Sequence, residues 1–537
     1  MWRPRPRHWA VVRLAGLCAQ PEERPVLLVL IMAAGFLFWK ARYLVYPDLA
    51  FTYPFITYDG FQWILDSGIY LGRDVTATYR NPALPVLVAC LDRLGAVRYL
   101  PLLTTALLGV FFVYLTLLLR EHHRPSIVAL TVALLFFNFT VQTIYDFVLA
   151  DQWAITCQMI AIYHLRRAKD GPRQLLLFAF WIAVSFSFQY AVAFVAPAFL
   201  YYYLTEIRPG ASSRRAVDRT ALLAVCLGLL LALPPFLYKW KKFGNPFFSH
   251  VTHFPLLKPH FFGMVYYGVN VLAFFGIPTA ALVVYGFCKG LRKNGFIGTM
   301  NLCIVCWVVF WVFLYSWLDS RFILYALPFA AFALAEGLHQ LDVPSFWSWK
   351  TQPFARTLVG CGLVLLALLY SLYDRGSPFA SNRLPLSPQN VLVFGIVPIA
   401  RWEANVTIDV AGWRIENATE GVPALHFLRR YYAEHRRRVP DARIEEQREL
   451  LQLATVAERT LGAKYRLAAC GKLADDYYSR MRREITLGRT LGSCTDRADA
   501  RLEPAGEAKA VHPLFAGRNY LLTRISEPDR PGSFGAR

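Results

Sequence analysis

The sequence predicts an all-α polytopic membrane protein with about eleven transmembrane helices, followed by a soluble C-terminal α/β domain. The first observation behind this fold class is the composition: 56% of the 537 residues are hydrophobic, 17% are charged and the mean hydropathy is +0.35. Soluble globular proteins have fewer hydrophobic and more charged residues. The second observation is a series of apolar segments between residues 1 and 373. The third is that residues 374–537 are nearly balanced in charge, with 26 of the 57 basic and 20 of the 36 acidic residues.

A membrane-spanning helix needs about 20 mostly apolar residues. The segments that meet or approach this criterion are 25–47, 99–119, 126–146, 149–165, 174–188, 190–204, 220–240, 264–288, 296–317, 322–340 and 356–373. The two short segments between residues 174 and 204 are separated only by SFQY. If they formed one bent span instead of two, every later segment would have the opposite orientation.

Basic residues indicate how these helices are oriented, because cytoplasmic loops are enriched in Lys and Arg. With a cytoplasmic N-terminus, 20 basic residues of the membrane portion fall inside and 11 outside. Eleven spans then place residues 374–537 on the non-cytoplasmic side. No small-residue cleavage site follows the basic start MWRPRPRHWAVVRLAG, so the first helix is expected to remain as an anchor. The Arg-rich, Lys-poor composition favours a bacterial inner membrane as the location.

Two outer segments are longer than hairpins, residues 48–98 and about 239–262, and the first is expected to form interfacial helices. In the tail, VLVFGIV and NVTIDVAGW are typical of short strands, whereas ALHFLRRYYAEHRRR and ARIEEQRELLQLATVAERTLG have helical spacing. Cys470 and Cys494 are the only cysteines of the tail. An extracytoplasmic location would allow a disulfide between them, and the sequence leaves this pairing open.

Several classes of function are disfavoured by the motifs that the sequence lacks. It contains no Walker phosphate loop, dinucleotide-binding fingerprint or HExxH zinc motif. The net charge of +21 does not indicate nucleic acid, because the surplus lies in short clusters between apolar segments, where it meets anionic lipid headgroups. Cys303 and Cys306 form a CxxC inside an apolar run and are expected to be core residues. His250 and His253 lack a nearby carboxylate, which disfavours a metal site.

Two acidic residues stand out among the eight that are expected at the outer side of the membrane portion. Asp59 lies among aromatic residues in FITYDGFQWIL, just after the first span. Asp151 lies in YDFVLADQWAI, at the outer end of the fourth span. An isolated acid at such a place is usually a helix cap or a solvated loop residue. Two acids at one membrane face favour a functional site, since an acid at membrane depth is costly unless it faces a cavity or a partner.

Basic side chains are expected at the same face. Arg80 lies in TYRNPALP, Lys241 in YKWKKFGNP and Lys258 in LLKPH. Anchoring at the membrane interface explains the lysines equally well. Arg321, in WLDSRFILYALP, directly starts an apolar segment and is harder to explain as an anchor. Carboxylates and cations that converge at one face suit a substrate with a phosphate group and an acceptor with a hydroxyl or amine.

The order of these segments resembles the GT-C class of membrane glycosyltransferases, particularly the protein O-mannosyltransferases and the bacterial lipid A aminoarabinose transferases. Residues 25–345 carry the resemblance. TYDGFQWILDSGIYLGRD followed by YRNPALPVLVACLDRLG resembles the family's first outer loop, and ADQWAITCQMIAIYHLRRA resembles its fourth span with an outer Asp. YKWKKFGNPF resembles a later outer loop, and SRFILYALPFAAFALAEG resembles a late helix that opens with Arg and contains a proline.

The resemblance implies a GT-C fold and transfer of a sugar from a polyprenyl-phosphate donor to a lipid, glycan or protein acceptor at the non-cytoplasmic face, by a single inverting displacement. It implies that Asp59 acts as general base or orients the acceptor, and that Asp151 shapes the same site. A divalent metal stays open as a cofactor, which Asp151 would help to hold. The cations implied to bind the donor phosphate are Arg80, Arg321, Lys241 and Lys258.

Two positions depart from the family pattern and leave the acceptor open. Asp59 is followed by Gly60 where many relatives have adjacent acids, and Asn81 precedes the proline where relatives often have Lys or His. The main alternative is a secondary transporter or flippase of a lipid or polar solute. It would place ionisable residues near the middle of the membrane, usually in two matching halves. A non-catalytic scaffold, the third hypothesis, would tolerate the loss of both Asp59 and Asp151.

Overall fold

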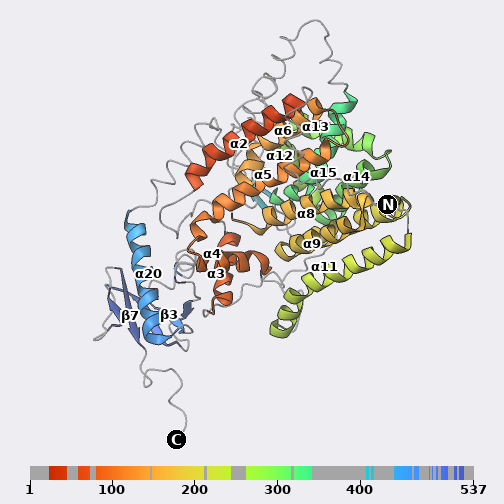
Figure 1. The fold of residues 1–537 in the computed structure, drawn as a ribbon. Helices are drawn as coiled ribbons and strands as arrows, with labels where there is room; N and C mark the ends of the chain where they lie inside the picture. Colours follow the sequence, from red (N-terminus) through yellow and green to blue (C-terminus); the bar gives the residue numbers. More distant parts are fainter. Residues whose placement is uncertain are drawn as a thin grey trace, which may run out of the picture.

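In the computed structural model the chain forms a helical bundle and, towards its C-terminus, a smaller α/β region (Figure 1). In the bundle the structure describes residues 23–44, 58–72, 80–145, 148–210, 214–243, 262–315 and 320–341. In the C-terminal part it describes residues 407–410, 413–416, 441–462, 465–470, 483, 487, 491–493, 498–505, 513–516 and 519–524.

Helices joined by short connections make up the described part of the bundle. The α-helices are α2 (Arg24–Leu44), α3 (Tyr58–Tyr70), α4 (Ala83–Arg93), α5 (Leu100–Leu119), α6 (Pro125–Phe136), α7 (Phe139–Ile144), α8 (Ala150–Arg166), α9 (Pro172–Phe188), α10 (Ala196–Tyr202), α11 (Arg214–Phe243), α12 (Phe262–Phe275), α13 (Ile277–Gly290), α14 (Gly295–Trp307) and α15 (Leu327–Gln340). The 3₁₀ segments are η4 (Val97–Tyr99), η5 (Arg167–Asp170), η6 (Tyr190–Val195) and η9 (Ser320–Ala326). The π-helical segments are η7 (Tyr203–Ile207) and η8 (Val308–Leu314).

The apolar segments of the sequence coincide with these helices. Within the described residues, four stretches are long and apolar enough to cross a membrane: Leu100–Leu119, Tyr190–Ile207, Gly295–Leu314 and Arg321–Gln340. Shorter apolar helices occupy Arg24–Phe38, Pro125–Phe136, Arg173–Phe188 and Thr279–Gly290. The predicted span 356–373 lies outside the described residues, so the total of eleven spans stays a prediction.

The chain reverses direction at Gln189, so residues 174–204 form a hairpin and not one bent span. Gln189 has an extended backbone, with φ −153° and ψ 119°, between α9 and η6. Its side chain reaches Asp151 at the start of α8. Glu206, at the other end of the returning segment, instead binds Lys169 just beyond the end of α8. The two short segments therefore run in opposite directions along α8, as predicted.

The segment predicted as one span at 264–288 is broken into α12 and α13. Gly276 separates them with a φ of 76°, a conformation that glycine adopts at little cost because it has no Cβ. A similar break separates α6 from α7 at Asn138. The Asn138 side chain donates a hydrogen bond to the Phe274 carbonyl (2.7 Å) and accepts one from the Val141 amide (3.2 Å). One buried amide thus satisfies backbone groups at both interruptions.

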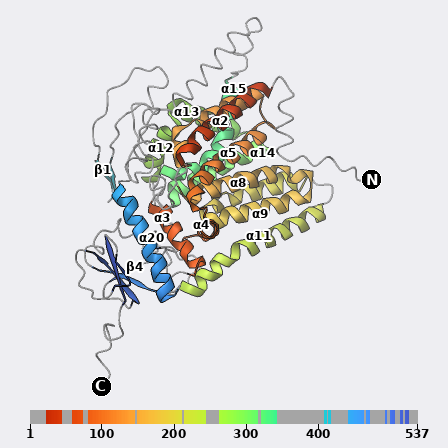
Figure 2. The same cartoon turned by 60° about the vertical axis from the view of Figure 1, so that its left-hand side comes forward.

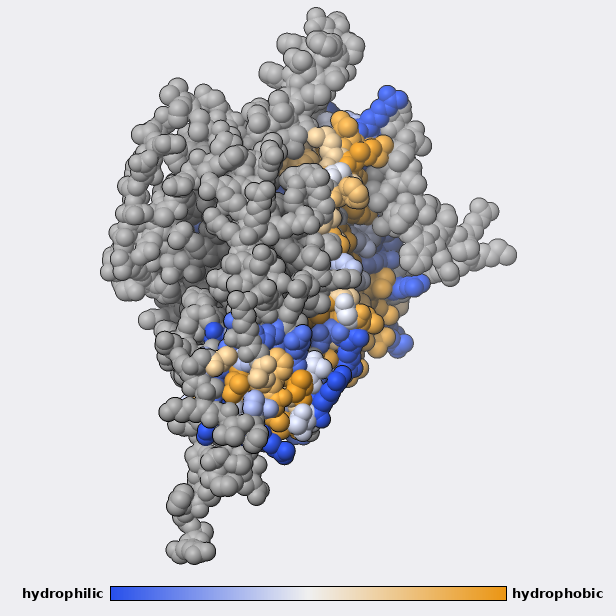
Figure 3. All heavy atoms as spheres, turned by 90° about the vertical axis from the view of Figure 1, so that its left-hand side faces the viewer, coloured by the Kyte–Doolittle hydropathy of each residue, from blue (hydrophilic) through white to orange (hydrophobic). Residues whose placement is uncertain are grey.

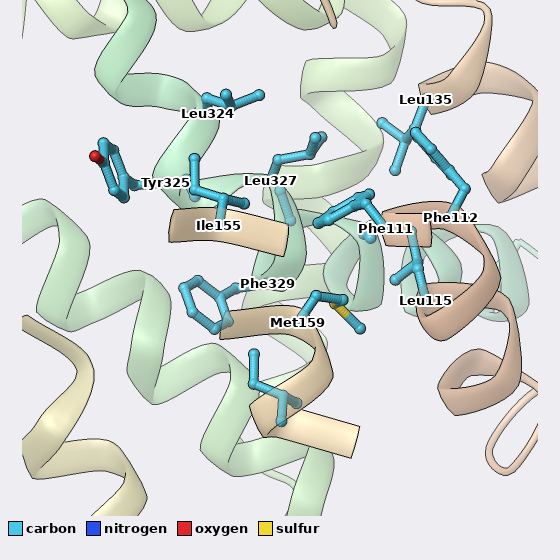
Figure 4. Packing of buried hydrophobic residues seen from close by; sticks show 14 of the residues in the cluster. Phe111, Phe112, Leu115, Leu135, Ile155, Met159, Leu324, Tyr325, Leu327 and Phe329 are labelled. Atoms are coloured by element: carbon cyan, nitrogen blue, oxygen red, sulfur yellow. The ribbon is translucent and has the colours of Figure 1, made fainter. Parts of the chain in front are cut away.

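The centre of the bundle is formed by α5, α8 and α15. Every residue of α15 from Leu327 to Leu338 is buried, and its aromatic and aliphatic side chains interlock with those of α5 and α8 (Figure 4). Phe112 packs edge-on against Phe136 of α6, with ring centroids 5.2 Å apart. A helix that is apolar on all sides and fully enclosed fits the interior of a membrane bundle.

Helix α11 lies on the outside of the bundle beside α9, which in turn packs on α8 (Figures 1 and 2). Much of its surface is apolar and exposed, including Leu222, Leu229, Leu230 and Leu237. Apolar side chains also reach the surface elsewhere on the bundle (Figure 3). Exposed apolar area on this scale would be unfavourable in water and is expected where helices face lipid.

Ion pairs gather at the end of the bundle that contains the C-terminus of α8, here called the basic end. Glu23 binds Arg120, Glu121 binds Arg166 (3.5 Å) and Lys169 binds Glu206 (2.7 Å). Lys293 binds Glu336 of α15 (2.7 Å). The basic clusters that the sequence assigns to the cytoplasmic side are therefore paired, in part, with acids from neighbouring segments.

The C-terminal part combines a helix with a mixed sheet, as predicted for an α/β tail. Its five strands lie in the order β4-β3-β5-β7-β6, with β3 parallel to β4 and β5, and β7 antiparallel to β5 and β6. Figure 2 shows α20 along this sheet, and Glu449 of α20 accepts hydrogen bonds from the backbone amides of Asn519 and Tyr520. The bounds are α20 (Asp441–Leu461), β3 (Leu467–Ala469), β4 (Leu491–Ser493), β5 (Ala500–Pro504), β6 (Phe515–Ala516) and β7 (Tyr520–Arg524).

Of the other elements predicted for the tail, the structure describes some, and others lie outside the described residues. The helix predicted from ARIEEQRELLQLATVAERTLG is α20. The strand predicted from NVTIDVAGW is a hairpin instead, β1 (Thr407–Val410) paired antiparallel with β2 (Trp413–Glu416). The segments VLVFGIV and ALHFLRRYYAEHRRR lie outside the described residues. Cys470 forms a disulfide, while Cys494, its predicted partner, also lies outside them.

Replacement of Gly286 by Ala is expected to destabilise the contact between α13 and α15. A Cβ at Gly286 would overlap the Ala333 carbonyl oxygen, so the two helix backbones must separate. Overpacking of this kind costs roughly 1–3 kcal/mol, and we expect a lower Tm in detergent, measured by fluorescence-detected size exclusion. Gly35→Ala in α2 is the matched control, since its Cβ would meet nothing within 4 Å. An equal Tm for both variants would contradict the close approach.

His123, in the turn between α5 and α6, predicts a loss of stability in acid. Burial lowers its pKa from 6.5 to about 4; Glu336 opposes this shift, while His339 and Lys293 add to it. Between these two pH values the unfolded chain binds more protons than the folded chain, so stability falls as the pH decreases from 6.5 towards 4. We expect His123→Gln to show a smaller Tm difference between pH 7 and pH 5 than the wild type. An unchanged difference would contradict this role for His123.

Candidate active site

Asp151 is a buried carboxylate in the first turn of α8. Its residue is only 1% exposed, and the N-terminal end of a helix favours a negative charge. One carboxylate oxygen, Oδ1, accepts hydrogen bonds from the Tyr325 hydroxyl and from Gln189 Nε2 (3.5 Å). The other oxygen, Oδ2, is buried and has no hydrogen-bond partner in the part of the chain that the structure describes. A buried acceptor without a partner is unusual and indicates a place for a ligand donor, water or ion.

Tyr325 reaches Asp151 from η9, which directly precedes α15. Its ring stacks on Trp311 of the π-helical segment η8, with centroids 5.2 Å apart and planes at 26°. Trp311 also stacks on Phe322, and the Trp307 indole donates a hydrogen bond to the Phe322 carbonyl (3.0 Å). These contacts hold η9 in place, so the position of the Tyr325 hydroxyl is set by packing. A π-helix that interrupts an α-helix often occurs near a functional site.

Gln189 and Asn81 connect Asp151 to the segment before α4. Asn81 is buried, and its amide nitrogen donates hydrogen bonds to Gln189 Oε1 (3.3 Å) and to the Phe188 carbonyl (3.1 Å). Gln189 in turn donates from Nε2 to Asp151. Three residues from distant parts of the chain therefore form one hydrogen-bonded row.

The two arginines predicted for the site lie next to this row. Arg80 precedes Asn81, and its guanidinium carbon lies 5.0 Å from the centre of the Trp63 ring in α3. Arg321 opens η9, one helical turn before Tyr325, and interacts electrostatically with it. Its guanidinium carbon is 5.3 Å from the Phe322 ring. The structure thus brings Asp151, Arg80 and Arg321 to the same end of the bundle, opposite the basic end.

The structure does not show the remaining predicted site residues, Asp59, Lys241 and Lys258, in contact with Asp151. Asp59 belongs to the first turn of α3, one turn before Trp63, but its side chain is outside the described set. Lys241 lies near the end of α11 and is exposed; among the described residues no hydrogen bond or ion pair joins it to Asp151. Lys258 lies in a segment outside the described ranges. The helices expected in the loop 48–98 are present as α3 and α4, which pack against each other, and their position at the membrane interface stays a prediction.

Sequence reasoning missed Tyr325 and Gln189 as partners of Asp151. Gln189 is the one amide in the run SFSFQYAVAF, and a polar side chain within an apolar hairpin could have identified it. Tyr325 gave no such signal, since tyrosines are frequent at helix ends in membranes. Asn81 was noticed only as a departure from the family pattern.

Within the described ranges there is no group of three or more His, Cys, Asp or Glu side chains that could hold a metal ion. Cys303 is buried, Cys306 is half-buried, and neither forms a disulfide. They are core residues, as predicted. His250 and His253 lie outside the described residues.

Comparison with known proteins identifies the fold. The structure is similar to ArnT from Cupriavidus metallidurans bound to undecaprenyl phosphate, with a TM-score of 0.51 and 13% identity over 93% of this chain and 97% of that chain. For ArnT in the apo state the TM-score is 0.52 and the identity 12%, over 92% and 97%. The archaeal oligosaccharyltransferase AglB from Archaeoglobus fulgidus gives a TM-score of 0.47 and 11% identity, over 89% and 69%.

ArnT and AglB are both GT-C glycosyltransferases. The chain therefore shares the membrane-enzyme fold of ArnT along almost its entire length, which confirms the GT-C fold that the sequence motifs predicted. No family model matches the sequence. No curated protein sequence matches it either.

Proposed function

We propose that this protein transfers a sugar from a polyprenyl-phosphate donor to a lipid, glycan or protein acceptor. The observation that carries the proposal is the arrangement around Asp151. It is a buried carboxylate with one oxygen that has no hydrogen-bond partner among the described residues, and it lies at the same end of the bundle as Arg80 and Arg321, in a chain with the ArnT fold. The crystal structure of ArnT with undecaprenyl phosphate supports a lipid-linked phosphate as the donor. The donor's chain would remain in the bilayer, which explains why the enzyme is embedded there.

The reaction needs a base and a cationic site for the leaving group. The acceptor oxygen or nitrogen attacks the anomeric carbon, the bond from that carbon to the phosphate oxygen breaks, and polyprenyl phosphate departs with its electron pair. In this proposal Asp59 takes the acceptor's proton or orients the acceptor, and Asp151 shapes the same site. Arg80 and Arg321 stabilise the phosphate, with Lys241 and Lys258 further out. A single displacement inverts the anomeric configuration.

The proposed location is a bacterial inner membrane with the site and residues 374–537 on the periplasmic side. The lysines and arginines that gather at the basic end, among them Lys169 and Lys293, support a cytoplasmic position for that end. The disulfide at Cys470 supports an oxidising compartment for the tail. Strands β3 and β4 are parallel, with Ala469 opposite Ser493, and Cys470 and Cys494 are the next residues in the sequence. Cys494 is therefore the proposed partner of Cys470.

Loss of either carboxylate is expected to abolish transfer. The experiment reconstitutes the purified protein with radiolabelled polyprenyl-phosphate sugars and native membrane acceptors, and compares Asp59→Asn and Asp151→Asn with the wild type. A general base typically accelerates a reaction roughly 10²- to 10⁴-fold, so its loss should slow transfer by about that factor. Asp218→Asn is the matched control, since Asp218 pairs with Arg208 on the exposed surface of the basic end. Full activity of Asp59→Asn would show that Asp59 is not the general base and that another group has this role.

Loss of a cation is expected to weaken donor binding instead. Arg321→Ala removes a charge-assisted contact to the phosphate, worth about 1.5–3 kcal/mol, and should raise the Kd for undecaprenyl phosphate roughly 10- to 100-fold. Arg124→Ala, at an exposed position of the basic end, is the control. Equal affinity in both variants would argue against Arg321 as a phosphate ligand. Absence of transfer from any donor, with solute uptake into the same liposomes, would favour the transporter hypothesis.

A further inference from the structure

We propose that Gln189 and Asn81 form an amide tether that positions Asp151, holding its Oδ1 so that Oδ2 stays available to a substrate donor. The inference rests on the proposed function, since it assigns Asp151 to the transfer site. Gln189 and Asn81 would act through Asp151 and are positioning residues.

The direction of the hydrogen bonds in the tether is fixed by its chemistry. The Asn81 nitrogen donates to the Phe188 carbonyl and to Gln189 Oε1, so the Gln189 oxygen must face Asn81. Gln189 Nε2 then faces the carboxylate, which can only accept. A flipped Gln189 amide would set two donors against each other at Asn81 and two acceptors against each other at Asp151. The row therefore has one favourable orientation.

The donors that Gln189 and Tyr325 offer to Oδ1 of Asp151 are both neutral. In the described part of the chain no ion pair is made by Asp151; its Oδ1 accepts from a phenol and an amide only. An arginine bound to the same oxygen would fix its position equally well but would neutralise the negative charge. With neutral donors at Oδ1, no cation of the described residues competes with a hydroxyl or ammonium donor of the substrate for Oδ2.

The tether also joins the two halves of the site. Asn81 follows Arg80, whose guanidinium lies over Trp63, and Trp63 is one helical turn from Asp59 in α3. At its other end, Gln189 is at the turn of the hairpin between α9 and η6, against the first turn of α8. The hydrogen bonds therefore fix Asn81, the residue after Arg80, relative to Asp151.

Gln189→Glu tests the tether because the substitution is isosteric. The new carboxylate removes the donor to Asp151 and places two like charges together. We expect kcat for sugar transfer to fall roughly 10- to 100-fold with the donor KM within about 2-fold of the wild type, and a greater loss than in Gln189→Ala. The matched control is Gln174→Glu, at the opposite end of α9, where Gln174 contacts His164. Its activity should equal that of the wild type.

A double-mutant cycle separates positioning from packing. In the Asp151→Asn background, Gln189→Glu should cause little further loss of residual transfer and a smaller decrease in Tm than it does in the wild type, because the repulsion requires the Asp151 charge. Wild-type kcat in Gln189→Glu, or equal effects in both backgrounds, would overturn the inference. Wild-type protein without any transfer would instead refute the proposed function. The Tm cycle would then identify the tether as a structural contact alone and overturn its positioning role.

Discussion

The carboxylate of Asp151, buried where α8 begins, is the group around which the site is organised. A buried charge is tolerated only when polar groups surround it, because water is not available to solvate it. Here the polar groups come from three separate segments. Tyr325 of η9 and Gln189 of the α9–η6 hairpin donate hydrogen bonds to Asp151, and Asn81, before α4, donates one to Gln189. Each of these segments is in turn held by packing, so the position of the charge depends on the whole bundle.

The two ends of the bundle meet different electrostatic requirements. At the basic end, acids and bases from adjacent segments pair with each other, which leaves little net charge at several of these contacts. At the Asp151 end, the carboxylate is bound by neutral donors, and Arg80 and Arg321 lie against aromatic rings. Helix α15 spans both ends, with Tyr325 just before its start and Glu336 near its end, and it is buried from Leu327 to Leu338.

Several features were predictable because they depend on local sequence. Apolar length predicted the helices of the bundle, and apolar residues at three- and four-residue spacing predicted α20. The motifs around Asp59, Asp151 and Arg321 predicted the GT-C fold, which the similarity to ArnT confirms. The breaks at Asn138 and Gly276 were not predicted, since both lie inside continuous apolar runs. Their cause is a tertiary hydrogen bond and a glycine conformation, and hydropathy reports neither.

The sequence by itself determined the membrane class, the order of the helices and the residue types able to bind a phosphate or accept a proton. Only the tertiary structure decided that Asp151 is bound by Gln189 and Tyr325, 38 and 174 residues away along the chain. It also decided that the chain turns back at Gln189, where the sequence left two alternatives open. The physical reason is that apolar periodicity predicts only whether a residue is buried away from water. The hydrogen-bond partner of a buried polar group depends on how the helices pack across the bundle.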